Sequence, residues 1–243
     1  MAFRILFDGT VAKHLDTPGE NEDAYRIAPA RGRVVLSDGA SESFDAKSWA
    51  NLVVDYFLES DPSDEELGSC IRSYEGLYDP HVLSWSKAAA YERGSFATLL
   101  IAQDDHDRST VTVTTLGDSF AVWCIGNDVI ETTPYVSADQ FTQKPTLLAT
   151  RPELNSEMII NELGTWSRIE WCYEQHDTCL LLCMTDALGA WLLNSREQGS
   201  LDAFERLSRI TDQKELLELV EVERASGAMR RDDVTLIIAT LTC

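Results

Sequence analysis

Basic residues are scarce in this sequence. It has 20 Lys and Arg against 41 Asp and Glu, so its formal net charge is −21 at pH 7. Binding to nucleic acid depends on clustered basic side chains that neutralise phosphates. The composition therefore argues against a nucleic-acid partner. If the substrate is an anion, bound cations would be needed to offset the negative field of such an acidic chain. The alternative is that the acidity only keeps the protein soluble.

Long apolar runs and paired cysteines are also missing. The first residues, MAFRILFDG, contain an apolar stretch too short for a signal peptide or a membrane helix. None of the six cysteines forms a C-x-x-C pair, and Cys179 and Cys183 lie in the strand-like run CLLLC. We therefore expect a cytoplasmic protein with reduced thiols, no disulfide framework and no membrane association.

The chain shows no internal repeat, low-complexity tract or linker. Its 243 residues are 44% hydrophobic and 25% charged, which is an ordinary globular composition with enough length for a full core. We predict a single domain that covers residues 1–243.

Apolar runs and amphipathic stretches alternate in blocks along the chain. Asp8-Gly9 suggests a turn, and residues 129–169 indicate an irregular flap. The predicted strands cover residues 3–7, 11–14, 33–36, 95–102, 110–116, 120–126, 168–173, 178–184 and 234–241, and the predicted helices cover 46–59, 67–78, 82–93, 200–210 and 212–223. Hairpin-like connections between the strands favour an α+β fold, a two-layer antiparallel β-sandwich flanked by helices.

The stretch RVVLSDGASES, residues 33–43, carries the first chemical signal. Its apolar run predicts a buried strand that delivers Asp38 to the strand end, and Gly39 lets the backbone turn sharply so that its carbonyl can face the same point. A single Asp-Gly is also typical of an ordinary strand-to-helix turn. Its meaning depends on the rest of the chain.

Further aspartates stand at strand boundaries, namely Asp23, Asp118, Asp186 and Asp232. Carboxylates that converge at one end of a sandwich raise each other's pKa sharply unless cations neutralise them. A set of oxygen ligands without His or Cys favours Mg²⁺ or Mn²⁺ over Zn²⁺. Two such ions about 3.5–4 Å apart can activate a bridging water for in-line attack on phosphorus.

Six blocks occur in a suggestive order: NEDA, VVLSDG, GSFATLLIA, LGDSFAVW, LLLCMTDALGAWL and RRDDVTLIIATL. In this order and spacing they resemble the metal-dependent type-2C protein serine/threonine phosphatases, and most closely a bacterial branch. The resemblance implies an α-β-β-α sandwich that hydrolyses phosphoserine and phosphothreonine through a metal-bridging water. It also implies a signalling role on phosphoprotein substrates of a serine/threonine kinase.

The resemblance also implies roles for individual residues. Asp38 would bridge two Mn²⁺ or Mg²⁺ ions, and Asp23, together with Glu22, would act through metal-bound water, so both count as catalytic. A third, weaker ion would involve Asp118. The complete metal set implied by the resemblance is Asp23, Asp38, the Gly39 carbonyl, Asp118, Asp186 and Asp232.

Several positions depart from the pattern of that family. Pro18 stands where many members carry an Arg that holds the substrate phosphate, which leaves Lys13 and His14 as candidates for that role. Ala40 stands where eukaryotic members have a His proposed as general acid, and Ala187 replaces a Gly. The polar loop ASES after Gly39 lacks further glycines, which changes the expected phosphate pocket.

Two other hypotheses remain open at this stage. A pseudophosphatase would have the same fold and would bind a phosphoprotein or regulate a partner without turnover. An acidic interaction protein with no metal site would require every strand-end aspartate to be incidental. The retained carboxylates favour an active phosphatase over both.

Overall fold

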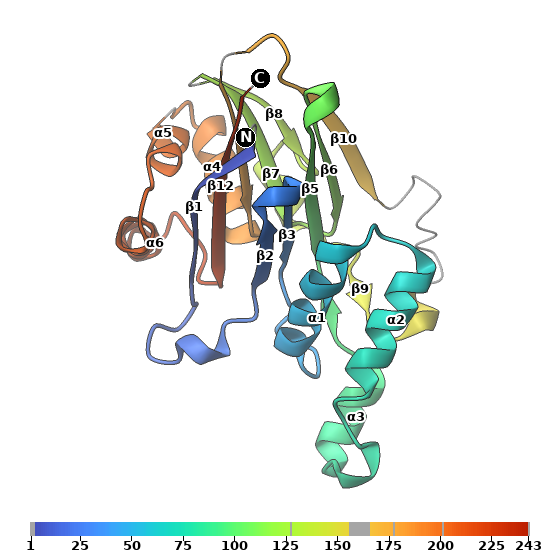
Figure 1. The fold of residues 1–243 in the computed structure, drawn as a ribbon. Coiled ribbons are helices and arrows are strands. Elements are labelled where there is room, and N and C mark those ends of the chain that lie inside the picture. The colour runs from blue at the N-terminus through green and yellow to red at the C-terminus, as the bar shows by residue number, and fades with distance from the viewer. Residues whose placement is uncertain (1–2, 127, 156–165, 177, 201, 243) are drawn as a thin grey trace.

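Two five-stranded antiparallel sheets form the centre of the computed structural model, which describes residues 3–126, 128–155, 166–176, 178–200 and 202–242 (Figure 1). The first sheet runs in the order β1 (Phe3–Val11), β12 (Val234–Leu241), β11 (Cys179–Met184), β7 (Phe120–Ile125) and β8 (Asp128–Thr133). The second runs β10 (Ser167–Cys172), β6 (Thr110–Leu116), β5 (Leu99–Asp105), β3 (Arg33–Ser37) and β2 (Ala24–Ala28). A short ladder joins β4 (Phe96–Ala97) to β9 (Leu148–Ala149).

Helices cover the outer faces of both sheets. The described helices are α1 (Ala46–Glu59), α2 (Asp64–Glu75), α3 (Trp85–Arg93), α4 (Asp186–Glu197), α5 (Asp202–Ser208) and α6 (Gln213–Ser226). Of these, α3 has no buried residue and extends away from the two sheets (Figure 1). Short 3-10 turns lie at η1 (Pro18–Glu20), η2 (Pro29–Arg31), η3 (Pro80–Val82), η4 (His106–Arg108), η5 (Ala138–Thr142) and η6 (Pro152–Asn155). Figure 1 shows α1 and α2 beside the second sheet and α4 to α6 beside the first. The predicted α-β-β-α sandwich is therefore confirmed.

Strand β3 explains how this layering arises from the sequence. Val34 and Leu36 point into the core between the sheets, whereas Val35 packs on the opposite face against Trp49 and Phe57 of α1. All of these side chains are fully buried. A strand covered on both faces is apolar at successive positions rather than alternating, as the run RVVLS is.

Several of the described elements differ from the sequence prediction; the strand predicted over residues 11–14, for example, is absent beyond Val11, where β1 ends. β1 continues without a turn through Asp8 and Gly9, since Phe7 packs closely over Gly9 and both residues pair with β12. The predicted strand 95–102 is divided at Thr98 into β4 and β5, and β5 extends to Asp105. Within 129–169, β8 forms a regular edge strand; residues 156–165 of the predicted flap lie outside the described ranges.

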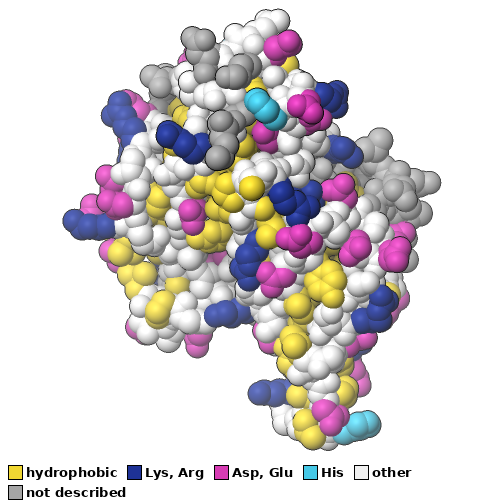
Figure 2. Space-filling view, viewed as in Figure 1, with side chains coloured by type: hydrophobic (Ala, Val, Ile, Leu, Met, Phe, Trp, Pro, Cys, Tyr) yellow, Lys and Arg dark blue, Asp and Glu magenta, His cyan; other side chains and the backbone are white. Residues whose placement is uncertain are grey.

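The remaining surface and thiol predictions can be compared with the structure directly. No helix among the described residues has the length and apolar character that crossing a membrane requires. Cys70, Cys124, Cys172 and Cys183 are free thiols, and only Cys172 among these four is exposed. On the face drawn in Figure 2, Lys and Arg side chains lie among Asp and Glu side chains and form no continuous basic area.

Candidate active site

Asp38 lies at the end of β3, where backbone contacts hold it in place. Its N–H donates to Thr98 Oγ1 at 2.8 Å, and its carbonyl accepts from the Thr98 N–H at 2.9 Å. A Cβ on the next residue, Gly39, would lie 2.8 Å from the Ala46 carbonyl oxygen at the start of α1. Glycine is needed here because the chain passes so close to the helix, and not because of an unusual backbone angle.

The loop that carries Asp118 is fixed by the same threonine. Gly117 adopts a φ of 93°, in the left-handed region that favours glycine, and its Cα packs toward the Thr98 methyl group. Ser119 Oγ and Thr98 Oγ1 are 2.6 Å apart and hydrogen-bonded. Thr98, whose role the sequence did not reveal, therefore links the turn after β3 to the turn between β6 and β7.

Asp23 enters the site from the loop before β2. Its Oδ2 accepts hydrogen bonds from Thr235 Oγ1 at 2.7 Å and Thr185 Oγ1 at 3.1 Å, while its Oδ1 is buried without a hydrogen-bond partner. Burial raises the pKa of Asp23 to about 7, with a further contribution from the charges of Asp233 and Asp232, although the threonine hydroxyls oppose the shift.

Asp233 ties that loop to the start of β12. The carboxylate is 4% exposed and accepts the Lys13 N–H at 2.7 Å on one oxygen and the Glu22 N–H at 2.8 Å on the other. Sequence reasoning assigned only Asp232 a role and missed its neighbour. The signal that could have identified Asp233 is the period of two in a strand, since successive side chains at its start point to opposite sides.

The predicted carboxylates act on one another electrostatically. The pKa of Asp38 is raised by burial and then by the charges of Asp23, Asp118 and Asp232, against a lowering by Arg230. Burial also raises the pKa of Asp118, with Arg230 opposing it and Asp232 adding to it. The structure therefore brings together aspartates from four separate loops.

Arg230 is the cation found within this group. Its guanidinium forms an ion pair with Asp186, and its Nε lies 3.8 Å from Asp232 Oδ2. No cluster of three or more His, Cys, Asp or Glu side chains in the described ranges is placed to hold a metal ion. The other oxygen of Asp186 is buried and has no hydrogen-bond partner.

The chemistry of these donors nevertheless fits a hard divalent cation. One oxygen each of Asp23 and Asp186 is buried and unpaired, which is costly for a carboxylate unless a cation or a donor reaches it. The surrounding ligands are all oxygens, the set that Mg²⁺ and Mn²⁺ prefer. The assignment of individual residues to individual ions stays a prediction.

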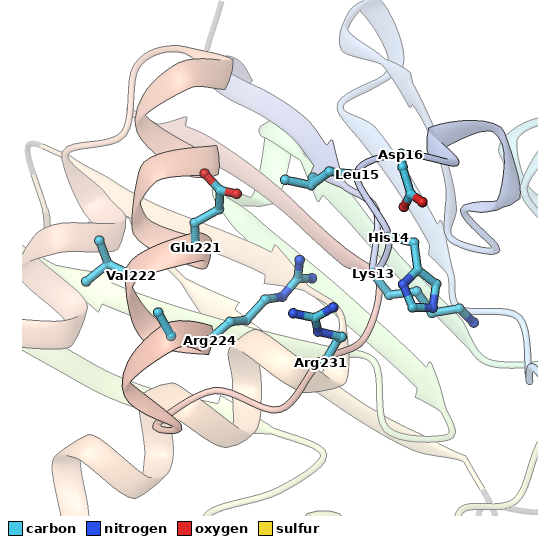
Figure 3. Close-up of a pocket in the computed structure, with 9 residues that line it drawn as sticks. Lys13, His14, Leu15, Asp16, Glu221, Val222, Arg224 and Arg231 are labelled. Carbon is cyan, nitrogen blue, oxygen red and sulfur yellow. The ribbon is translucent and has the colours of Figure 1, made fainter.

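The two phosphate-binding candidates lie in different surroundings. Lys13 Nζ is 2.9 Å from Glu22 Oε2 and 2.7 Å from Ser41 Oγ, and Ser41 in turn donates to Glu22. Lys13 thus lies at the margin of the carboxylates, beside the loop ASES. The His14 side chain lines a neighbouring groove, shown in Figure 3, and has no hydrogen bond to a described carboxylate.

Comparison with known proteins places the fold. No family model matches the sequence, and no curated protein matches it. Among solved structures, the chain is similar to the serine/threonine phosphatase PstP of Mycobacterium tuberculosis, with 15% identity, a TM-score of 0.61 and coverage of 100% of both chains. It is similar to the serine/threonine phosphatase Stp1 of Staphylococcus aureus at 17% identity and a TM-score of 0.61, over 100% of this chain and 96% of the other.

A bacterial serine phosphatase shows the same likeness. It has 17% identity and a TM-score of 0.59, over 99% of this chain and 98% of the other. The resemblance to bacterial type-2C serine/threonine phosphatases that the six sequence blocks indicated is thus confirmed at the level of the fold, along the whole chain.

Proposed function

We propose that this protein is a metal-dependent phosphoprotein phosphatase that hydrolyses phosphoserine and phosphothreonine. The observation that carries the proposal is the convergence of Asp23, Asp38, Asp118 and Asp232 at one end of a sandwich with the fold of serine/threonine phosphatases. Arg230 bridges this group to Asp186. Repelling carboxylates lower stability, so their retention favours a role in binding cations.

Mn²⁺ or Mg²⁺ would be held by Asp38, the Gly39 carbonyl and Asp23, together with Asp186 and Asp232, and a further ion by Asp118. When bound, such cations acidify water and neutralise charge on phosphoryl oxygens. The supporting residues act on the ligands themselves: Thr185 and Thr235 orient one oxygen of Asp23.

Cationic side chains at the site would bind the substrate phosphate. Lys13 lies at its margin with the Ser41 hydroxyl as a neighbour. Arg230 supplies a guanidinium within the site, although the sequence has Pro18 where the resemblance leads us to expect an Arg. Planar guanidinium groups bind phosphate oxygens in pairs, so Arg230 is the better candidate once cations occupy the carboxylates.

Phosphate release from a phosphothreonine peptide tests the proposal. We expect release that requires Mn²⁺ or Mg²⁺ and that is lost in Asp38→Asn, with a circular-dichroism spectrum that matches the wild-type protein. Release by Asp38→Asn at the wild-type rate would refute the site. Mn²⁺ binding without any release would support the pseudophosphatase instead.

A further inference from the structure

A groove lies beside the carboxylate site, between α6 and the loop that follows β1. Its volume is about 700 Å³. Lys13, His14 and Asp16 line it from the loop, Glu221 and Arg224 from α6, and Arg231 from the segment before β12. Figure 3 shows Arg224 and Arg231 extending into the space between the helix and the loop.

The guanidinium groups of Arg224 and Arg231 lie near each other in the groove (Figure 3). Arg224 donates to the backbone carbonyls of Ala12, at 3.1 Å, and Asp232, and its Nε is buried without a partner. Burial lowers the pKa of Arg224 and the charge of Arg231 lowers it further, whereas the charges of Asp233, Asp232 and Glu221 oppose the shift. Arg231 is exposed and has no ion pair or hydrogen bond to any residue that the structure describes.

Two arginines without a direct ion pair to a described residue lie together in this groove, although the chain as a whole is strongly acidic. Acidic residues outnumber basic ones by 41 to 20, and many of the other described arginines, such as Arg33 and Arg206, form ion pairs with carboxylates. Asp16 and Glu221 also line the groove, but neither forms an ion pair with Arg224 or Arg231. The exposed Arg231 guanidinium, which has no described partner, can bind a carboxylate or another oxyanion, and Arg224 beside it adds positive charge.

The groove is continuous with the proposed active site. Lys13 lines the groove, and its ammonium contacts Glu22 and Ser41 at the margin of the carboxylates. Arg231 directly precedes Asp232 in the chain. A polypeptide with its phosphorylated residue at the carboxylates would therefore extend its neighbouring residues toward the arginine pair.

We propose that this groove binds an acidic segment of the phosphoprotein substrate, next to the phosphorylated residue. The proposal rests on the function proposed above and adds a preference for substrates with acidic flanking residues. It also has an electrostatic reason: a chain with a net charge of −21 repels acidic polypeptides, and a local pair of cations would orient them at the site.

A binding measurement tests the groove without any need for turnover. The Asp38→Asn protein is titrated, with Mn²⁺ present, against fluorescent phosphothreonine peptides that carry a run of Glu before or after the phosphorylated residue. Matched peptides carry Gln at the same positions. Fluorescence anisotropy gives Kd for each pair.

We expect at least one acidic peptide to bind about fivefold more tightly than its Gln counterpart, as one exposed ion pair at the upper end of measured strengths allows. Adding Arg231→Glu should bring this ratio to 1 or below. Lys87→Glu, the same charge change on exposed α3, should leave it unchanged. A ratio near 1 with Arg231 intact would overturn the proposal, as would a ratio that Arg231→Glu does not alter.

The two proposals fail separately. If the wild-type protein releases phosphate with Mn²⁺ but the Asp38→Asn protein does not prefer acidic peptides, the groove proposal alone is refuted. A preserved acidic preference without any phosphate release would refute the phosphatase function alone.

Discussion

Replacing Asp233 by Ala should loosen the loop that carries Asp23. The Asp233 carboxylate holds two backbone N–H groups of that loop, at 2.7 Å from Lys13 and 2.8 Å from Glu22, and is only 4% exposed. Removing it leaves both donors without their acceptor. The predicted effect is therefore a loss of stability together with a displaced Asp23.

The magnitude follows from the two hydrogen bonds. A hydrogen bond to a charged group contributes about 1.5–3 kcal/mol, and partial access of water to both N–H groups reduces the loss, so we expect about 2–4 kcal/mol for Asp233→Ala. Asn keeps one acceptor oxygen and should cost about half as much. Loss of a charge that raises the pKa of Asp23 offsets part of either value. Mutation of a residue that holds a metal ligand in place typically lowers metal affinity by about 10–100-fold. We therefore expect Asp233→Ala to weaken Mn²⁺ binding by at least about tenfold.

Urea unfolding followed by tryptophan fluorescence measures the stability change, since the chain has six Trp residues. Isothermal titration with Mn²⁺ measures the affinity. The control is Asp107→Ala, which removes an exposed aspartate with no hydrogen bond or ion pair to a described residue. The reasoning is refuted if Asp233→Ala stays within about 0.5 kcal/mol of the control, the range of ordinary surface substitutions, and binds Mn²⁺ as the wild-type protein does.

Three further predictions concern the same end of the sandwich. Gly39→Ala should lower the unfolding free energy by about 1–3 kcal/mol, because its methyl group would meet the Ala46 backbone. The control Gly68→Ala, inside α2, should instead raise the unfolding free energy by about 0.5–1 kcal/mol. If the two variants change the unfolding free energy equally in urea, the prediction for Gly39 is wrong. Arg230→Ala should tighten Mn²⁺ binding in calorimetry while raising KM for a phosphopeptide, and an unchanged Kd would argue that Arg230 does not compete with cations. Without metal, the folded protein holds a proton on Asp23 more tightly than the unfolded chain does, since the pKa rises from 3.8 to about 7. The Asp23 contribution to stability should therefore fall as pH rises from about 4 to about 7. The free energy of unfolding of the wild-type protein should fall relative to that of Asp23→Asn over this range. A difference between the two proteins that does not change with pH would contradict the pKa shift.

Much of the architecture could be predicted because burial leaves a pattern in the sequence. The alternation TVTVTTL gave β6 with its observed ends, Thr110 to Leu116. The apolar run before Asp38 gave a strand buried on both faces. In contrast, β8 is an exposed edge strand whose residues DVIETT show neither alternation nor an apolar run. Gly9 suggested a turn, yet it pairs with Leu236 of β12, and Gln213 and Phe7 occupy the space that a side chain at this position would need.

The candidate site also contains some residues that the sequence could reveal and others that it could not. Aspartates at strand ends could be recognised because each stands beside a clear apolar run. Thr98 could not, since a buried threonine looks like many structural residues until its partners are known, and Asp233 had only the period of two at the start of a strand to mark it. The position of Arg230 depends on how a loop folds back over the carboxylates, and no periodic pattern encodes that.

The pairing of β1 with β12 has a consequence for how the protein is made. These strands lie at opposite ends of the sequence, with Phe3 beside Leu241 and Val11 beside Val234. During synthesis on a ribosome, β1 emerges first and must wait for nearly the whole chain before its partner exists. Asp23 gains its Thr235 donor only at that last stage. The complete set of mutually repelling carboxylates is therefore assembled only after β12 has been made, when the sandwich can hold them together.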